Sequence, residues 1–128
     1  MIVNDPETRA EVERAFAAYE QALVSNDVES LDGFFWSDPL AVRYGAGENL
    51  YGYDAIAAFR AARSPAGLMR RLQQTVVTTF GNDFATACTL FTRDTAPGMV
   101  GRQTQTWARK REGWKIVAAH VSVIPSPV

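Results

Sequence analysis

The most constraining feature of this 128-residue chain is a change in the spacing of its apolar residues near Gly67. Before Gly67, apolar residues recur about every four positions, as they do on one face of an α-helix. After it, they alternate in runs rich in Thr, Val, Phe and Trp, which is typical of β-strands. Helices followed by long strands indicate an α+β domain in which three N-terminal helices pack on one face of a curved, mostly antiparallel sheet.

The expected elements follow from these two periods. Three helices are expected over residues 6–25, 28–36 and 53–63, the first with an apolar stripe of Val12, Phe16, Tyr19 and Leu23. A short strand is expected at 40–44, and four antiparallel strands at 68–80, 83–95, 101–111 and 114–124. The length suits one core and is too short for two, so residues 1–128 are expected to form a single domain.

Composition excludes several classes of partner. The formal net charge of −1 gives no general attraction to nucleic acid or to an anionic membrane. Cys88 is the only cysteine, so no internal disulfide is possible, and this residue is expected to be buried. The N-terminus lacks the pattern of a signal peptide, and no run of eighteen apolar residues occurs, so we expect a cytoplasmic protein.

Two residues place a polar group in apolar surroundings. Tyr19 lies midway along the apolar stripe of the first helix, and Arg43 lies inside the short run Leu-Ala-Val-Arg-Tyr. A buried, unpaired guanidinium is costly, so an inward Arg43 requires either an anionic ligand or an internal carboxylate such as Asp38 or Glu48. For Tyr19, the alternative is a core tyrosine bonded to a polar neighbour. If both residues point into one cavity, that cavity binds an anion.

Further candidates lie in the last strand and the third helix. His120 and Ser122 share a face of the last strand, which we expect on the helix side lining a cavity, although a core histidine is an alternative. The other face is also largely apolar, which suggests contact with a second subunit. Arg60 and Arg63 are expected either to join Arg43 or to be solvated cations near a helix end.

The remaining candidates are polar or aromatic residues without a standard motif. The polar stretch around Gln105 is expected to offer amide or guanidinium contacts, and Trp36 to wall a cavity or to fill the core. No nucleophile elbow, phosphate loop, dinucleotide fingerprint or carboxylate dyad is present, and no metal or organic cofactor is expected. The acidic residues near the short strand are expected to be caps or solvated groups: Asp38, Glu48 and Asp54.

The order of elements, with the segments Gly52–Phe59 and Gly113–Ser122, resembles the nuclear transport factor 2-like superfamily, in its SnoaL-like group. The resemblance covers nearly the whole chain and implies a cone-shaped α+β roll, a pocket between sheet and helices, and a homodimer through the open sheet face. Ketosteroid isomerases of this superfamily pair a first-helix tyrosine with an aspartate base on the first strand. Tyr19 matches that tyrosine, but Arg43 stands where the base is expected, so steroid isomerisation is not expected.

More closely, three segments resemble a small subfamily that includes the 1,3-dicarboxyurea amidohydrolase of cyanuric acid catabolism and the oxalurate-catabolism protein. These segments are Val42–Gly45, Phe59–Arg63 and Gly101–Trp107. The resemblance implies a metal-free, decarboxylating amidohydrolase that acts on N-carboxylated ureas in bacterial nitrogen catabolism and is associated with an amidase. It also implies that Tyr19 and Arg43 are the catalytic pair.

In that interpretation, Arg43 anchors a substrate carboxylate and Tyr19 donates a proton or a hydrogen bond as the carbamate C–N bond breaks. Arg60 or Arg63 would hold a second carboxylate, and His120 would relay the proton. Two other classes stay open. A SnoaL-like isomerase or cyclase on an acidic substrate predicts an inward carboxylate close to Tyr19. A non-catalytic anion-binding or amidase-accessory protein predicts no turnover.

Overall fold

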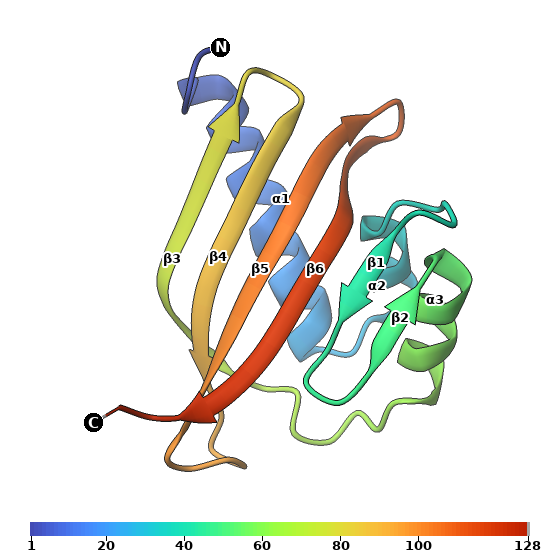
Figure 1. The fold of residues 1–128 in the computed structure, drawn as a ribbon, viewed down its shortest axis with the longest axis vertical. Helices are drawn as coiled ribbons and strands as arrows, with labels where there is room; N and C mark the ends of the chain where they lie inside the picture. Colours follow the sequence, from blue (N-terminus) through green and yellow to red (C-terminus); the bar gives the residue numbers. More distant parts are fainter. Residues whose placement is uncertain (128) are drawn as a thin grey trace.

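The computed structural model describes residues 1–127, which form three helices and one six-stranded sheet (Figure 1). The helices are α1 (Pro6–Val24), α2 (Val28–Phe34) and α3 (Tyr53–Ala62). The strands are β1 (Val42–Tyr44), β2 (Asn49–Tyr51), β3 (Arg71–Phe80), β4 (Phe84–Thr92), β5 (Met99–Lys110) and β6 (Gly113–Pro125). The expected α+β architecture is confirmed. No described helix combines the length and the apolar character needed to cross a membrane.

The sheet has the strand order β2-β1-β6-β5-β4-β3. Strands β3 to β6 form the expected antiparallel meander, and β1 pairs in parallel with β6. The strand β2 was not predicted, because it has only three residues and no apolar alternation. Helix α1 lies along one face of the long strands, while α2 and α3 lie beside the β1–β2 hairpin (Figure 1). The opposite face carries no helix, and a second copy covering it remains a prediction.

The core lies between α1 and the helix-facing side of the sheet. The predicted stripe of α1 is buried, with Val12 fully inaccessible and Phe16 6% exposed. Small residues such as Ala85 and Ala87 let the helix approach β4, and the fully buried Trp107 fills the space beside them. Cys88 alternates with these alanines and is half-buried rather than buried as expected. Large and small side chains thus interdigitate to close the core.

A β-bulge in β6 decides which side chains face the helices. Trp107 pairs with Ile116, but Thr106 pairs with Ala118, so Val117 is an extra residue in β6. One extra residue reverses the face that all later side chains take. Ile116 therefore faces the core before the bulge, and the odd-numbered residues from Ala119 onward face it afterwards.

The start of α1 is fixed by Asp5. Its Oδ2 accepts hydrogen bonds from the backbone N–H of Thr8 at 3.0 Å and from the Thr8 hydroxyl at 2.9 Å. The hydrogen bonds from Thr8 lower the pKa of the Asp5 carboxyl below its ordinary value. A carboxyl with a lowered folded-state pKa stabilises the protein above its unfolded pKa, and this stabilisation is lost as the pH falls through the folded pKa.

We therefore expect Asp5→Ala to unfold at a lower urea concentration than the wild type at pH 7. The difference should shrink as the pH falls below about 4, where the carboxyl of the unfolded chain begins to protonate, and should vanish once the pH is below the lowered pKa of the folded carboxyl. Urea denaturation at pH 7 and pH 3 measures both values. A difference that is equally large at the two pH values would contradict the assigned role of the charged carboxylate.

Candidate functional site

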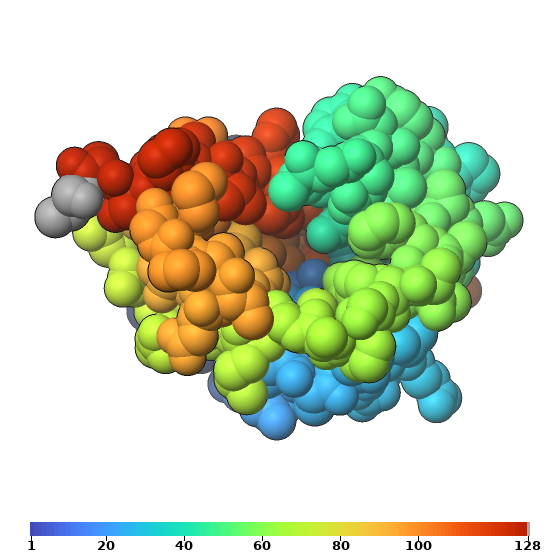
Figure 2. Space-filling model, turned by 90° about the horizontal axis from the view of Figure 1, so that it is seen from below, coloured from blue at the N-terminus to red at the C-terminus, as the bar shows by residue number. Residues whose placement is uncertain are grey.

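A cavity of about 240 Å³ opens between α1, the β1–β2 hairpin, the segment after α3 and the neighbouring ends of the long strands. Figure 2 shows its mouth as a central hollow bounded by teal, yellow-green, orange and red segments. The volume is below the ~300–1,000 Å³ of pockets for drug-sized ligands, so the ligand must be small. The polar residues of the lining are Tyr19, Arg43, Glu48, Arg63, Arg70, Arg93 and Gln103.

Arg43 faces this cavity and is paired with Glu48. Its Nη1 donates to Glu48 Oε1 at 2.8 Å, and its guanidinium lies 5.6 Å from the ring centroid of Phe59. The other carboxylate oxygen, Oε2, accepts from the backbone N–H of Gly47 at 3.2 Å. Of the two partners considered for Arg43, the structure supplies the internal carboxylate. Glu48 therefore lines the cavity, and the expectation that it is a solvated loop group is wrong.

The ion pair of Arg43 and Glu48 depends on a glycine. A Cβ atom at Gly45 would overlap the Glu48 carboxylate. Only glycine leaves room for this carboxylate to lie against the backbone of the hairpin. The pairing neutralises much of the charge of Arg43 but leaves its other N–H groups available to a ligand.

Arg70 also lines the cavity and is fully paired. Its Nε donates to Glu20 Oε2 at 2.8 Å and its Nη2 to Glu20 Oε1 at 2.6 Å, a two-pronged contact. The same Nη2 also donates to Gln103 Oε1 at 3.2 Å. The Arg70 side chain is only 2% exposed. Its charge is therefore compensated inside the protein, and it acts as a fixed support for Gln103.

Arg63 and Arg93 differ from the other two arginines because neither has a carboxylate partner within residues 1–127. The Nε and Nη2 atoms of Arg63 and the Nε atom of Arg93 are buried and donate to no acceptor. Burial lowers the pKa of Arg63, and the nearby charge of Arg60 acts in the same direction. Burial and the nearby Arg70 lower the pKa of Arg93. Both cations thus lie where an anion would stabilise them.

The charges around the cavity do not balance. Four guanidinium groups line it, and the ion pairs with Glu48 and Glu20 compensate two of them. Guanidinium groups stay protonated in proteins, so two positive charges remain without a partner among the described residues. This arrangement attracts a small anion and favours two negative charges over one.

Tyr19 lines the same cavity. Its ring makes edge contacts with Phe34 and Phe35, at centroid distances of 6.0 Å and 6.4 Å, and the residue is 5% exposed. Tyr19 lies close enough to Arg63 to raise the pKa of that guanidinium, which opposes the lowering caused by burial. Tyr19, Arg43 and Arg63 are thus the candidates from the sequence that the structure brings together.

Two other candidates lie outside the cavity. Arg60 is 3% exposed, and its Nη1 donates to Asp32 Oδ1 at 2.7 Å while its guanidinium lies over the ring of Phe35. Arg60 therefore forms a structural ion pair with Asp32 and does not join Arg43 at the cavity. Trp36 lies in a separate hollow beside Tyr53, and the Nζ of Lys110 lies 4.3 Å from the centroid of its ring. The expectation that Trp36 walls the cavity is wrong.

The candidates on β5 and β6 are also displaced from the cavity. Gln105 is 1% exposed, and its Oε1 accepts from Trp107 Nε1 at 3.0 Å, so its neighbour on the same face, Gln103, reaches the cavity instead. His120 and Ser122 lie on the helix-free face, because the bulge at Val117 reverses their orientation. Placing them on the helix side was wrong, and His120 cannot relay a proton to Tyr19 across the sheet.

Four polar lining residues were not among the candidate site residues, namely Glu48, Arg70, Arg93 and Gln103, and Arg93 had a readable signal. The buried positions of β4 alternate from Ala85 to Phe91, and continuing this alternation leads to Arg93. For Gln103, the sequence pattern left the two faces of its strand equivalent. Glu48 was considered as a partner of an inward Arg43, but nothing in the sequence distinguished it from Asp38 or from a solvated carboxylate.

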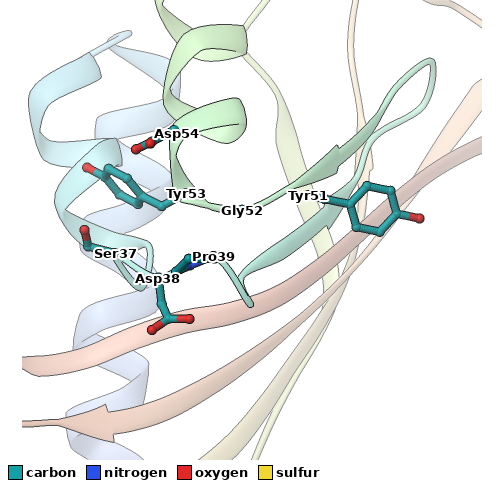
Figure 3. A pocket seen from close by; sticks show the side chains of 7 residues that line it. All are labelled: Ser37, Asp38, Pro39, Tyr51, Gly52, Tyr53 and Asp54. Atoms are coloured by element: carbon teal, nitrogen blue, oxygen red, sulfur yellow. The ribbon is translucent and has the colours of Figure 1, made fainter.

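A second hollow, of about 250 Å³, lies outside the cavity at the junction of β2 and α3 (Figure 3). Its charged groups are the carboxylates of Asp38 and Asp54, and the ring of Tyr51 points away from the other labelled side chains. Asp38 Oδ1 accepts from the backbone N–H of Leu40 at 2.9 Å, so it fixes the chain as a turn residue. This hollow repels anions. Among residues 1–127, no three His, Cys, Asp or Glu side chains gather in a way that suits a metal ion.

The fold and cavity define the class of protein: an α+β roll of the nuclear transport factor 2-like, or cystatin-like, type. A nuclear transport factor 2-like superfamily protein from Salmonella enterica serovar Typhimurium, 19% identical, superimposes with a TM-score of 0.74 over 95% of this chain and 94% of its own, which shows the fold. The chain belongs to the AtzH-like family, whose model matches residues 1–127. The resemblance seen in the sequence is thereby confirmed.

Two solved structures are much more similar in sequence. A protein of unknown function from Pectobacterium atrosepticum is 56% identical, with a TM-score of 0.93 and coverage of 95% of this chain and 94% of that chain. A cystatin-like fold protein from Burkholderia xenovorans is 53% identical, with a TM-score of 0.95 and coverage of 99% of both chains. Among curated proteins, none matches this chain.

Proposed function

We propose that this protein is an amidohydrolase that removes a carboxyl group from a small N-carboxylated urea, of the type 1,3-dicarboxyurea to allophanate. The carrying observation is the placement of Tyr19, Arg43 and the unpaired Arg63 around one cavity with surplus positive charge. Membership of the AtzH-like family supports the same reaction class, through the resemblance described for the sequence.

The reaction breaks the C–N bond of the N-carboxyl group. Carbon dioxide leaves, the bonding electrons pass to the urea nitrogen and its carbonyl oxygen, and a proton adds to the nitrogen. Arg43 orients the leaving carboxylate, and because Glu48 already compensates part of its charge, it does so without holding that carboxylate too tightly. The hydroxyl of Tyr19 and the cation of Arg63 stabilise the charge that develops on the urea.

The test follows allophanate formation from freshly generated 1,3-dicarboxyurea. We expect the wild type to exceed the uncatalysed rate and Arg43→Lys to lower kcat/KM by about 10- to 100-fold, since an ammonium loses a charge-assisted hydrogen bond of the guanidinium. The matched control is Arg71→Lys, because Arg71 is exposed and pairs only with Asp94 at the surface. A folded wild type that does not exceed the uncatalysed rate would overturn the proposal.

A second candidate, an isomerase or cyclase acting on an acidic substrate, gains support from Glu48. That class requires an inward carboxylate near Tyr19, and Glu48 lines the same cavity. However, both carboxylate oxygens of Glu48 already accept hydrogen bonds, from Arg43 and Gly47, so neither oxygen is free to take a proton from a substrate without losing one of these contacts. The decarboxylating reaction is therefore preferred, and a Glu48→Gln variant that keeps its activity would exclude Glu48 as the base.

A further inference from the structure

We propose that Arg93 and Gln103 form a second anion subsite in the cavity, which binds the carboxylate that the substrate retains. The cavity would then select small dianions with an acid group at each end. The identity of the retained group rests on the proposed function. The subsite itself rests on the geometry of the far side of the cavity and is tested separately.

The cavity has two clusters of polar groups from different parts of the chain. The near cluster contains Tyr19, the Arg43 and Glu48 ion pair, and Arg63, which come from α1, the β1–β2 hairpin and the end of α3. The far cluster comes from the ends of β3 and β4 and from β5, and includes Arg93. Arg70 and Glu20 affect the pKa of Arg93 more than Arg63 does. One cavity therefore presents an uncompensated cation in each cluster.

Gln103 lines the cavity and keeps its amide nitrogen as an unpaired hydrogen-bond donor. Its Oε1 accepts from Arg70 Nη2 at 3.2 Å, and the two-pronged contact of Arg70 with Glu20 holds that donor in place. An amide oxygen must face the guanidinium, because Arg70 has no acceptor, so the amide cannot rotate by half a turn. The Nε2 atom of Gln103 consequently lacks a partner and is buried.

The orientation of Arg93 is set by an aromatic ring. Its guanidinium carbon lies 4.7 Å from the ring centroid of Phe91, and that of Arg70 lies 4.6 Å from the same centroid. Phe91 takes this position because its register partner on β5 is Gly101, where a Cβ atom would overlap the ring. The sequence of β5 thus makes room for the ring against which Arg93 lies.

The unpaired groups at this subsite are all donors. The Nε of Arg93 and the Nε2 of Gln103 are both buried without an acceptor, which is unusual for groups in a folded protein. A carboxylate offers several acceptor positions in one plane and matches the donor edge of a guanidinium. A neutral group at this end of the ligand would leave the charge of Arg93 uncompensated. The chemistry therefore selects a short dicarboxylate over the corresponding monocarboxylate.

Binding of stable acids tests the subsite without requiring turnover. Glutarate has an acid group at each end of a three-carbon spacer, and butyrate is its monocarboxylate counterpart. We expect the wild type to bind glutarate more tightly than butyrate. In Arg93→Gln, the dissociation constant for glutarate should rise by about 10- to 100-fold, while that for butyrate should change much less. Isothermal titration calorimetry at constant ionic strength gives both dissociation constants. The control for the loss of one positive charge is Arg111→Gln, because Arg111 is exposed in the turn between β5 and β6.

Gln103→Glu is a second variant, with a side chain of the same size and an added negative charge beside Arg93. It should abolish the preference for glutarate over butyrate even if Arg93→Gln does not fold. Equal weakening of both acids in Arg93→Gln, or an unchanged preference in Gln103→Glu, would overturn the subsite.

The outcome also separates the subsite from the proposed reaction. A protein that prefers glutarate through Arg93 but does not convert 1,3-dicarboxyurea keeps the subsite and loses the proposed function. A protein that converts 1,3-dicarboxyurea with an unchanged KM in Arg93→Gln keeps the function and loses the subsite.

Discussion

Replacing Tyr19 with phenylalanine is expected to lower kcat on 1,3-dicarboxyurea by about 10²- to 10³-fold, the usual effect of removing one donor to the transition state. Phenylalanine keeps the edge contacts with Phe34 and Phe35 and removes only the hydroxyl. In the proposed reaction, the hydroxyl interacts most strongly with charge that develops as the C–N bond breaks. For that reason kcat should fall far more than KM changes.

The matched control for this prediction is Tyr53→Phe. Tyr53 is the first residue of α3, is half-buried and does not line the cavity, so its hydroxyl should not affect the rate. Initial rates at several substrate concentrations, corrected for uncatalysed decomposition, separate kcat from KM. Glutarate binding should survive in Tyr19→Phe, since the anion subsites remain. A folded Tyr19→Phe variant with wild-type kcat would remove Tyr19 from the mechanism.

The fold could be predicted because its signals are local. The apolar stripe of α1 and the alternation of the long strands each repeat over many residues, so small errors at their ends do not change the architecture. Strand β2 escaped prediction because three residues, exposed or half-exposed, carry no period. Its partner β1 is equally short but contains the inward Arg43, which stood out against its apolar neighbours.

The site was only partly predictable because its geometry depends on single backbone events. Arg60 and Arg63 lie one turn apart and look equivalent in a helical pattern. The helix ends at Ala62, and Arg63 adopts an extended conformation (φ −74°, ψ 139°). Arg63 therefore lines the cavity, whereas Arg60 remains in the helix and donates to Asp32. In the same way, the extra residue Val117 moved two candidates of β6 to the opposite face. No periodicity in the sequence marks either event.

The largest expected loss of stability comes from Trp107→Ala. Trp107 is fully buried, and its indole Nε1 donates to Gln105 Oε1 at 3.0 Å. Truncation leaves a large cavity and an unpaired buried acceptor, and such changes cost about 3–5 kcal/mol in unfolding free energy. The total free energy of unfolding of small domains is only about 5–15 kcal/mol, so this variant should be close to unfolding at physiological temperature. Urea denaturation monitored by circular dichroism measures the difference.

Trp107→Phe separates packing from hydrogen bonding in this prediction. It keeps an aromatic ring near Phe34, whose centroid lies 6.1 Å from that of Trp107, but leaves Gln105 without its donor. Its loss of stability should therefore be the smaller of the two, about 1–3 kcal/mol. Because Phe34 also contacts Tyr19, the alanine variant should disturb Tyr19 as well as the core. Equal stability of Trp107→Ala and the wild type would contradict the placement of this residue at the centre of the core.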